Sequence, residues 1–381
     1  MIATPFTPTL DSGRARRTYG IVKALAQHGP VDMVYGAFGA GAPDPAYEAL
    51  DGLRLHRAES PSAAARLPAY LRARVVGGAP EGFARGVWPQ VAALTRKLAD
   101  RDAGARVIAD GPVAAAGLLA LAKRRAVVYS AHNLESAFRH QLSDTSLSPG
   151  GLMRFERRLL RRFAESWMVS RSDIEGARGL EPSATLRLVP NVIDVAQIKP
   201  VSLSRERRSV LFLADMRYEP NRNAARFLFE EVLPAAWQLA PELTLTVAGL
   251  RSSELSHPDP RVTVEGFVDD LAPLYDAAGC AAVPLLEGGG SPLKFVEALA
   301  YGVPVVATAR AAAGLSARPN IEYFEGGTDG AAFGAALVRA LGPEGHAVTV
   351  AGRQLAEAEY SIEALARLLA PGVSADETTS P

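Results

Sequence analysis

The stretch "EGGGSPLKFVEALAYGVPVVAT", residues 287–308, runs from three glycines into a helical pattern and then into an apolar, strand-like run. Glycines ahead of a helix let an anion approach the spare N–H donors and the partial positive charge of the helix N-terminus. The alternative is a flexible turn. The stretch therefore predicts either a phosphate-facing loop or a plain connection between a strand and a helix.

The helix in this stretch should begin near Ser291 or Pro292, because Ser can cap a helix and Pro is tolerated in a first turn. Its period leaves Lys294 and Glu297 free to turn toward the preceding loop. One set of side chains should face a core, namely Leu293, Phe295, Val296 and Leu299.

Short apolar runs alternate with helical patterns on both sides of this stretch, which is typical of an α/β fold with parallel sheets. We expect two doubly wound, Rossmann-like domains, spanning residues 1–195 and 196–355, with an interdomain cleft. Ligands of such sheets bind outside the carboxyl ends of the strands. Residues 356–371 should form a helix that packs back toward the N-terminal domain, and residues 372–381 a disordered tail.

The composition bears on the size of the core and on the cellular compartment. Hydrophobic residues make up 48% of the 381, so large cores can form. The charges balance overall, but residues 1–195 carry 26 Lys and Arg against 18 Asp and Glu, and residues 196–381 carry 15 against 23. A single cysteine, Cys280, lies in an apolar run, and the first residues show no export signal, so we expect a cytoplasmic protein.

Acidic pairs and histidines give little reason to expect a metal. "DRD" at Asp100 and Asp102 lies where surface acids are ordinary, Asp269 and Asp270 fit a helix cap, and the histidines are scattered. We expect no metal and no cofactor. We also expect no nucleic-acid partner, because the basic residues lack interleaved aromatics.

Several segments resemble the retaining glycosyltransferases of family 4 and follow one another along the chain in the same order as in those enzymes. They are "VVYSAHNLES" with His132, "FAESWMVSRSDIEGA", "LVPNVIDVAQIKP", "LFLADMRYEPNRNAARFLFEEVLP" and the stretch quoted above. Within this family, the chain resembles the branch whose members have a His-Asn-x-Glu segment and a Gly-Gly-Gly-Ser/Thr-x-Leu-Lys donor loop. The resemblance spans roughly residues 5 to 315.

The resemblance implies a GT-B fold and a metal-independent glycosyltransferase that takes a nucleoside diphosphate sugar as co-substrate. The N-terminal domain would hold the acceptor, whether a sugar, a lipid-linked molecule or a small molecule, and the C-terminal domain the donor. His132 and Lys294 would be the catalytic residues. The donor-binding residues would be Gly13, Arg217, Gly288, Gly289, Gly290, Ser291, Pro292, Leu293 and Glu297.

The chain departs from the family pattern at the donor site. Gly289 stands where these enzymes usually carry the first of two glutamates, while Glu297 matches the second, which is implied to bind ribose. Asp215 and Pro220 stand where many relatives carry an Arg and a Lys that hold the diphosphate. Arg217 and Lys294 are the candidates to compensate, helped by helix dipoles.

Other functions stay open on the sequence alone. A nucleotide-sugar epimerase or a phosphorylase could share the architecture, and the altered donor loop also fits a non-catalytic nucleotide-sugar-binding protein. The segment "GLMRFERRLLRRFAESW", residues 151–167, is a basic amphipathic helix that either lies on an anionic membrane or packs its apolar face on the domain core. Peripheral membrane contact on the cytoplasmic face is therefore a further expectation.

Overall fold

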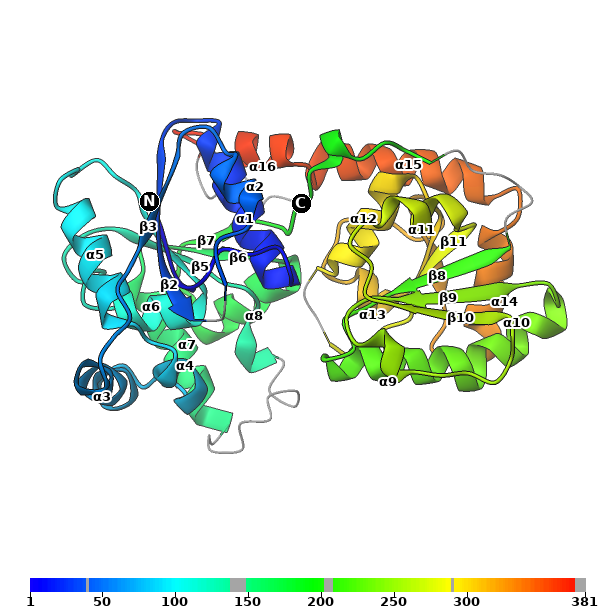
Figure 1. Ribbon diagram of the computed structural model, residues 1–381, viewed down its shortest axis with the longest axis horizontal. Helices are drawn as coiled ribbons and strands as arrows, with labels where there is room; N and C mark the ends of the chain where they lie inside the picture. The colour runs from blue at the N-terminus through cyan, green and yellow to red at the C-terminus, as the bar shows by residue number, and fades with distance from the viewer. Residues whose placement is uncertain (39–40, 138–148, 202–207, 289–290, 374–381) are drawn as a thin grey trace. The chain divides into compact units, whose positions relative to one another are not determined.

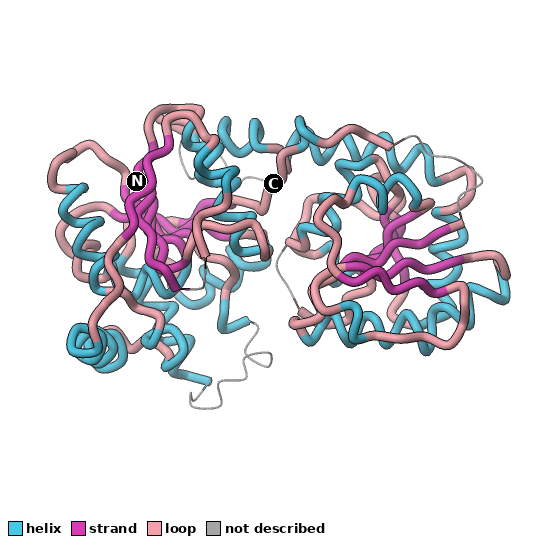
Figure 2. Tube along the Cα trace, in the orientation of Figure 1, coloured by secondary structure: helices cyan, strands magenta, loops and turns pink. Residues whose placement is uncertain are grey.

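The computed structural model describes residues 1–38, 41–137, 149–201, 208–288 and 291–373. The chain divides into two compact units, each built around its own parallel sheet. The first unit holds Met1–Pro190 together with the residues from Leu365 onward, and the second holds Asn191–Ala364. The α/β architecture expected from the alternating pattern is confirmed (Figure 2).

The first unit contains a seven-stranded sheet in the order β3-β2-β1-β4-β5-β6-β7, with every pair parallel. The order reverses between β1 and β4, as in doubly wound folds. Its strands are β1 (Ile2–Phe6), β2 (Val31–Phe38), β3 (Leu53–Arg57), β4 (Val107–Asp110), β5 (Val127–Ser130), β6 (Glu165–Met168) and β7 (Leu186–Leu188).

Helices cover both faces of this sheet (Figure 1). α5 and α6 pack on β1, α1 packs on β2, and α8 packs on β6 and β7. The helices of this unit are α1 (Gly13–Ala26), α2 (Pro45–Glu48), α3 (Ala63–Leu71), the π-helical η1 (Arg72–Val76), α4 (Glu81–Arg85), α5 (Pro89–Ala99), α6 (Gly111–Leu118), α7 (Pro149–Arg162) and α8 (Arg171–Leu180).

The second unit contains a six-stranded parallel sheet in the order β10-β9-β8-β11-β12-β13. Its order reverses between β8 and β11. Its strands are β8 (Ser209–Leu213), β9 (Thr244–Ala248), β10 (Val262–Gly266), β11 (Cys280–Val283), β12 (Val305–Thr308) and β13 (Phe324–Gly326).

In this unit α10 packs with α14 and α12 packs with α15. Its helices are η3 (Val195–Gln197), α9 (Glu219–Phe227), η4 (Leu228–Val232), α10 (Leu233–Leu239), η5 (Ser252–Glu254), α11 (Ala272–Ala277), α12 (Leu293–Tyr301), α13 (Ala309–Ala312), α14 (Gly330–Ala340) and α15 (Gly345–Glu359). Cys280 on β11 is fully buried, as expected for a small core residue.

The quoted stretch folds as a loop, α12, a turn and β12. Phe295, Val296 and Leu299 are buried and Leu293 is partly buried, as the helical period predicts. The expected start is corrected by a residue or two: α12 begins at Leu293, because Pro292 occupies the N-cap position and no side chain caps the helix.

The apolar face of α7 lies in the core of the first unit. Leu152, Phe155, Leu159 and Leu160 of α7, and Phe163 directly after it, are all buried there. Of the two alternatives left open for this helix, packing on the domain core is the one the structure contains. Among the helices that the structure describes, none is long and apolar enough to cross a membrane.

The C-terminal segment breaks into two helices, since α15 ends at Glu359 and α16 spans Ile362–Leu369. From Leu365 onward it belongs to the first unit. There the ring Nε2 of His28 lies 2.7 Å from the carbonyl oxygen of Ala366, and Leu365 and Leu369 are buried. The expected tail lies outside the described residues from position 374 onward.

Candidate functional site

In the second unit, polar side chains gather where β8 ends and α12 begins. The Lys294 ammonium donates to Oδ1 of Asn221 at 2.8 Å, and the amide of Asn221 donates to the carbonyl oxygen of Asp215 at 2.8 Å. Asn221 lies in the first turn of α9, and Asp215 follows β8. Lys294 is thus held toward the loop after β8 and the start of α9.

The Lys294 amine is poised to change its charge near neutral pH. Burial lowers its pKa to about 7, against the opposing effect of the Glu297 and Asp215 carboxylates. Its Nζ lies 5.0 Å from the centre of the Phe212 ring, an apolar neighbour that limits hydration. An ammonium in so dry a place gains more from an added anion than an exposed one would.

The start of α12 offers hydrogen-bond donors. The Ser291 side chain is 4% exposed, and its hydroxyl has no hydrogen-bond partner among the described residues. The Ser291 carbonyl oxygen, in contrast, accepts from the Asn191 amide at 2.9 Å, which fixes the chain at this point. A buried hydroxyl without a partner beside a helix N-terminus is a place where a bound anion would complete the hydrogen bonding.

Of the three consecutive glycines 288–290, Gly288 is the one that lies within the described residues. Its φ of +94° is a conformation that favours glycine. A Cβ at Gly288 would lie 3.1 Å from the hydroxyl of Tyr218, and its carbonyl oxygen accepts from Arg310 at 3.3 Å. A backbone running this close to its neighbours explains a glycine here without any ligand.

Arg217 and Glu297 occupy different surroundings. The Arg217 guanidinium donates to both carboxylate oxygens of Asp215, with the shortest contact at 2.7 Å. Burial alone would raise the pKa of Asp215, but this guanidinium holds it below its ordinary value. The charge of Arg217 is therefore largely offset by Asp215. Glu297 lies on α12, one turn from Lys294, and is 7% exposed.

In the first unit, His132 and Asp110 meet beyond the carboxyl ends of β5 and β4. The ring Nε2 of His132 lies 3.1 Å from Oδ1 of Asp110, and the Thr18 hydroxyl donates to Oδ2 of Asp110 at 2.9 Å. The His132 side chain is 11% exposed and Asp110 is fully buried. This pair orients the imidazole at the sheet edge where doubly wound folds bind ligands.

Gly111 makes room for the His132 ring. Its φ is +81°, and a Cβ there would lie 2.4 Å from Cε1 of His132. Position 111 therefore requires a glycine for two reasons: the backbone conformation favours glycine, and the His132 ring leaves no space for a Cβ. The sequence "ADGP" encodes both the carboxylate and the gap for the ring.

Gly13 is the first residue of α1, and the Ser12 hydroxyl caps this helix by accepting from the N–H of Ala15 at 3.3 Å. Nearby Arg17 is buried, and its Nη1 donates to the Val189 carbonyl oxygen at 2.7 Å. Burial lowers the pKa of Arg17 to about 10, although neighbouring carboxylates raise it. Gly13 thus lies exposed beside a buried, structural arginine.

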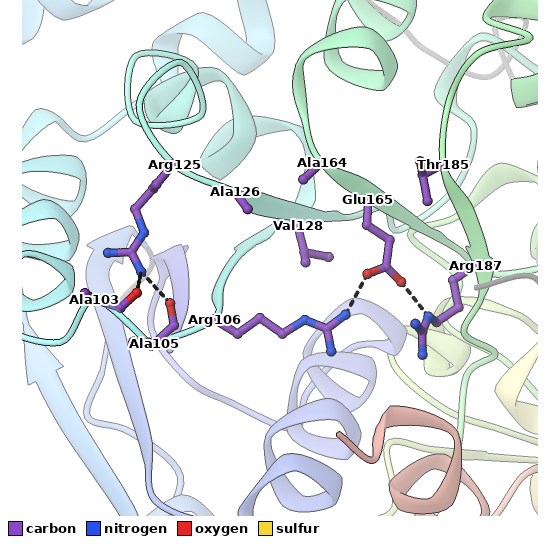
Figure 3. A pocket seen from close by; sticks show the side chains of 11 residues that line it. Ala103, Ala105, Arg106, Arg125, Ala126, Val128, Ala164, Glu165, Thr185 and Arg187 are labelled. Atoms are coloured by element: carbon purple, nitrogen blue, oxygen red, sulfur yellow. Dashed lines mark hydrogen bonds and ion pairs between the residues drawn. The ribbon is translucent and has the colours of Figure 1, made fainter. Parts of the chain in front are cut away.

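A cavity of about 450 Å³ opens at the amino ends of β4 to β7, the sheet edge opposite to His132 (Figure 3). Glu165 lies there between Arg106 and Arg187, at 2.6 and 2.5 Å. Arg125 donates to three backbone carbonyl oxygens, and Arg187 donates to two more besides Glu165. These guanidinium groups tie strand and helix ends together, so the cavity is not the catalytic candidate.

Within the described ranges, no group of three or more His, Cys, Asp or Glu side chains is arranged to hold a metal ion. Asp102 accepts from the N–H of Gly104 at 3.0 Å, which is a local turn contact. Asp270 accepts from the N–H of Ala272 at 3.0 Å, at the start of α11. Metal independence stays a prediction.

Ser291, Pro292 and Leu293 lie at the start of α12, Lys294 follows in its first turn, and Glu297 lies one turn further on. Sequence reasoning missed two residues that hold the candidates in place, Asp110 and Asn221. Asp110 carried a usable signal, because it is a charged residue at the end of an apolar strand. Asn221 could be recognised only once its distance to Lys294 was known.

Comparison with known proteins gives a consistent picture. Residues 207–342 match the family model described as Glycosyl transferases group 1. That match covers most of the second unit and includes Asn221, Ser291, Lys294 and Glu297. No curated protein sequence matches the chain significantly.

Three solved structures are similar to the whole chain. Sucrose-phosphate synthase from Thermosynechococcus elongatus is 18% identical, covering 97% of this chain and 96% of that one, with a TM-score of 0.71. Anabaena HepE in complex with UDP and glucose is 15% identical over 97% of each chain, with a TM-score of 0.69. WaaG, a glycosyltransferase involved in lipopolysaccharide biosynthesis, is 13% identical over 100% of each, with a TM-score of 0.62. Across both units, then, the chain has the α/β fold of these proteins, which is the GT-B fold that the sequence predicted.

Proposed function

We propose that the protein is a glycosyltransferase that moves a sugar from a nucleoside diphosphate sugar to an acceptor hydroxyl, without a metal and with retention at the anomeric carbon. The observation that carries the proposal is the buried Lys294 ammonium held by Asn221 beside the start of α12. The match of residues 207–342 to a glycosyltransferase family supports it. A polysaccharide, glycolipid or natural-product acceptor fits equally well.

The chemistry asked of these residues is electrostatic. The bond between the anomeric carbon and the diphosphate breaks, and the leaving diphosphate takes the electron pair. The bond to the acceptor oxygen forms, and an oxygen of the leaving diphosphate takes the proton of the acceptor hydroxyl. Lys294, the Ser291 hydroxyl and the N–H groups at the start of α12 would stabilise that growing negative charge. Glu297 would accept from the ribose hydroxyls, and His132, oriented by Asp110, would contact the donor sugar and diphosphate.

Calorimetry with UDP, GDP, ADP and dTDP tests donor binding. UDP comes first because HepE was solved with UDP and with UDP-glucose. Lys294→Met should weaken binding of the preferred diphosphate by about 10- to 100-fold, the usual worth of a hydrogen bond to a charged group. Lys199→Met is the matched control, since Lys199 is the other lysine of the second unit and is exposed. Equal affinities for both variants would remove Lys294 from the site.

The same titration has a pH signature. Because the pKa of Lys294 is about 7 in the free protein, the ammonium is present below that pH and is lost above it. Diphosphate affinity should therefore fall as the pH rises from 6.5 to 8.5, by up to about tenfold per pH unit. The Lys294→Met variant should show no such slope. A wild-type affinity that is flat over this range contradicts the assignment.

The second candidate is a non-catalytic nucleotide-sugar-binding protein. The pairing of Arg217 with Asp215 favours it, because that arginine's charge is offset before any donor arrives. Binding by calorimetry without transfer to any acceptor or hydrolysis of any donor would support this candidate. Isomerised donor in the absence of acceptor would instead indicate an epimerase.

A further inference from the structure

An apolar stripe lies exposed along α3 and η1 of the first unit. Leu67, Leu71, Val75 and Val76 are 59%, 48%, 78% and 66% exposed. Leu67, Leu71 and Val75 recur at intervals of four residues, which places them on one side of the helical segment. Scattered apolar side chains on a surface are ordinary, but a contiguous set on one helix face indicates an interaction site.

The stripe carries an excess of positive charge. Residues 60–80 contain three arginines and no Asp or Glu, and Glu59 and Glu81 flank this segment. Arg66 and Arg72 are exposed and lie one residue from Leu67 and Leu71. Arg158 of α7 reaches the same place, since its guanidinium donates to the backbone carbonyl oxygen of Val76.

The segment is anchored from beneath, so its exposed side is a fixed feature. Ala73 is buried in the core of the first unit, and a Cβ at Gly77 would lie 2.5 Å from the carbonyl oxygen of Ala73. Arg74 donates to the carbonyl oxygen of Ala79 at 3.0 Å, which closes the turn after η1. The apolar side chains therefore stay exposed on a well-packed element.

We propose that the stripe on α3 and η1 docks on an anionic lipid surface. Leucine and valine side chains would enter the boundary between headgroups and acyl chains, while the arginines extend to lipid phosphates. Charge complementarity selects this occupant, because arginines without an intervening acid fit a continuous negative surface. The site differs from the apolar face of α7, which is buried.

Vesicle sedimentation of the full chain tests the proposal. Binding to vesicles of equal phosphatidylglycerol and phosphatidylcholine should be at least about tenfold tighter than to phosphatidylcholine alone, and should weaken in high salt. Leu71→Asp with Val75→Asp should reduce binding at least about tenfold. Arg66→Gln with Arg72→Gln should remove the preference for anionic vesicles.

The matched control is Leu239→Asp on α10 of the second unit, where Leu239 is 59% exposed. This variant should bind vesicles like the wild type. All the substituted side chains are exposed, so circular dichroism and thermal unfolding should show intact variants. The assay contains no donor or acceptor, so its failure and a failure of the proposed transferase activity are distinguishable.

Three results would overturn the proposal. The first is equal vesicle binding by Leu71→Asp/Val75→Asp and the wild type. The second is equal binding to neutral and anionic vesicles. The third is self-association in analytical ultracentrifugation that this double variant abolishes while no vesicle binding occurs, which would assign the stripe to contacts between copies of the chain.

Discussion

The carboxylate of Asp110 fixes the orientation of the His132 ring. Burial alone would raise the pKa of Asp110, but the His132 ring, the Thr18 hydroxyl and the charge of Arg14 hold it below its ordinary value. A buried carboxylate that stays ionised orients the imidazole through a charge-assisted hydrogen bond. Asp110 is in this sense a positioning residue for His132.

Asp110→Asn should lower turnover about 10- to 100-fold, because an amide keeps the shape but not the charge. The KM for donor should change little if the interaction matters only after the donor is bound. Thr18→Val is the control: it removes the other hydrogen bond to Asp110 and leaves the one to His132. Steady-state kinetics that give Asp110→Asn and Thr18→Val the same turnover would refute the positioning role.

At this scale the sequence identifies candidate residues more readily than the residues that hold them in place. His132, Lys294 and Glu297 lie in motifs with fixed spacing, so one segment suffices to find each of them. Asn221 meets Lys294 across 73 positions of sequence, and such a contact depends on how α9 and α12 pack.

At the scale of elements, buried acidic side chains lie where α7 packs against the turn after β5. Oε2 of Glu156 accepts from the N–H of Ser136 at 3.0 Å, and Oδ1 of Asp173 on α8 accepts from the N–H of Leu134 at 3.2 Å. Burial, with repulsion among the carboxylates, raises the pKa of both Glu135 and Glu156 to about 7. These elements therefore pack best when the glutamates are protonated.

Glu156→Gln should make stability less dependent on pH. The folded pKa of Glu156 is above its unfolded value of 4.5, so its contribution to stability is complete below about pH 4.5 and is lost as the pH rises past 7. Relative to the wild type, the variant should gain about 2 kcal/mol in unfolding free energy between pH 5 and pH 8.5. Urea unfolding at both pH values measures the difference.

Glu175→Gln on α8 is the control, since Glu175 is exposed. If it gains as much between the two pH values as Glu156→Gln, burial is not the cause. The sequence could predict that α7 is amphipathic, because its leucines and phenylalanines repeat with a helical period. It gave no sign that Glu156 is buried with them, since that residue lies in a run of arginines.

The whole molecule contains two parallel sheets. The alternating sequence pattern predicts that these sheets exist, but it does not predict the order of their strands. Short apolar runs identify strands, but the neighbours of β1 are β2 and β4, a choice made by the packing of the intervening helices. The contribution of the residues after Leu365 to the first unit likewise depends on contacts far apart in sequence. Arg187 on β7 donates to the carbonyl oxygens of Leu368 and Val373, more than 180 positions away.

This long-range contribution predicts which unit a distant mutation weakens. Leu369 is 2% exposed and belongs to the first unit, so Leu369→Ala should destabilise that unit by about 2–5 kcal/mol. Hydrogen exchange should then quicken in peptides covering β1 to β7 and stay unchanged in β8 to β13. Leu337→Ala on α14, where Leu337 is fully buried in the second unit, should produce the reverse pattern. If either variant quickened exchange equally in both units, they would unfold as one, and the division of the chain at Pro190 and Leu365 would not describe its cooperativity.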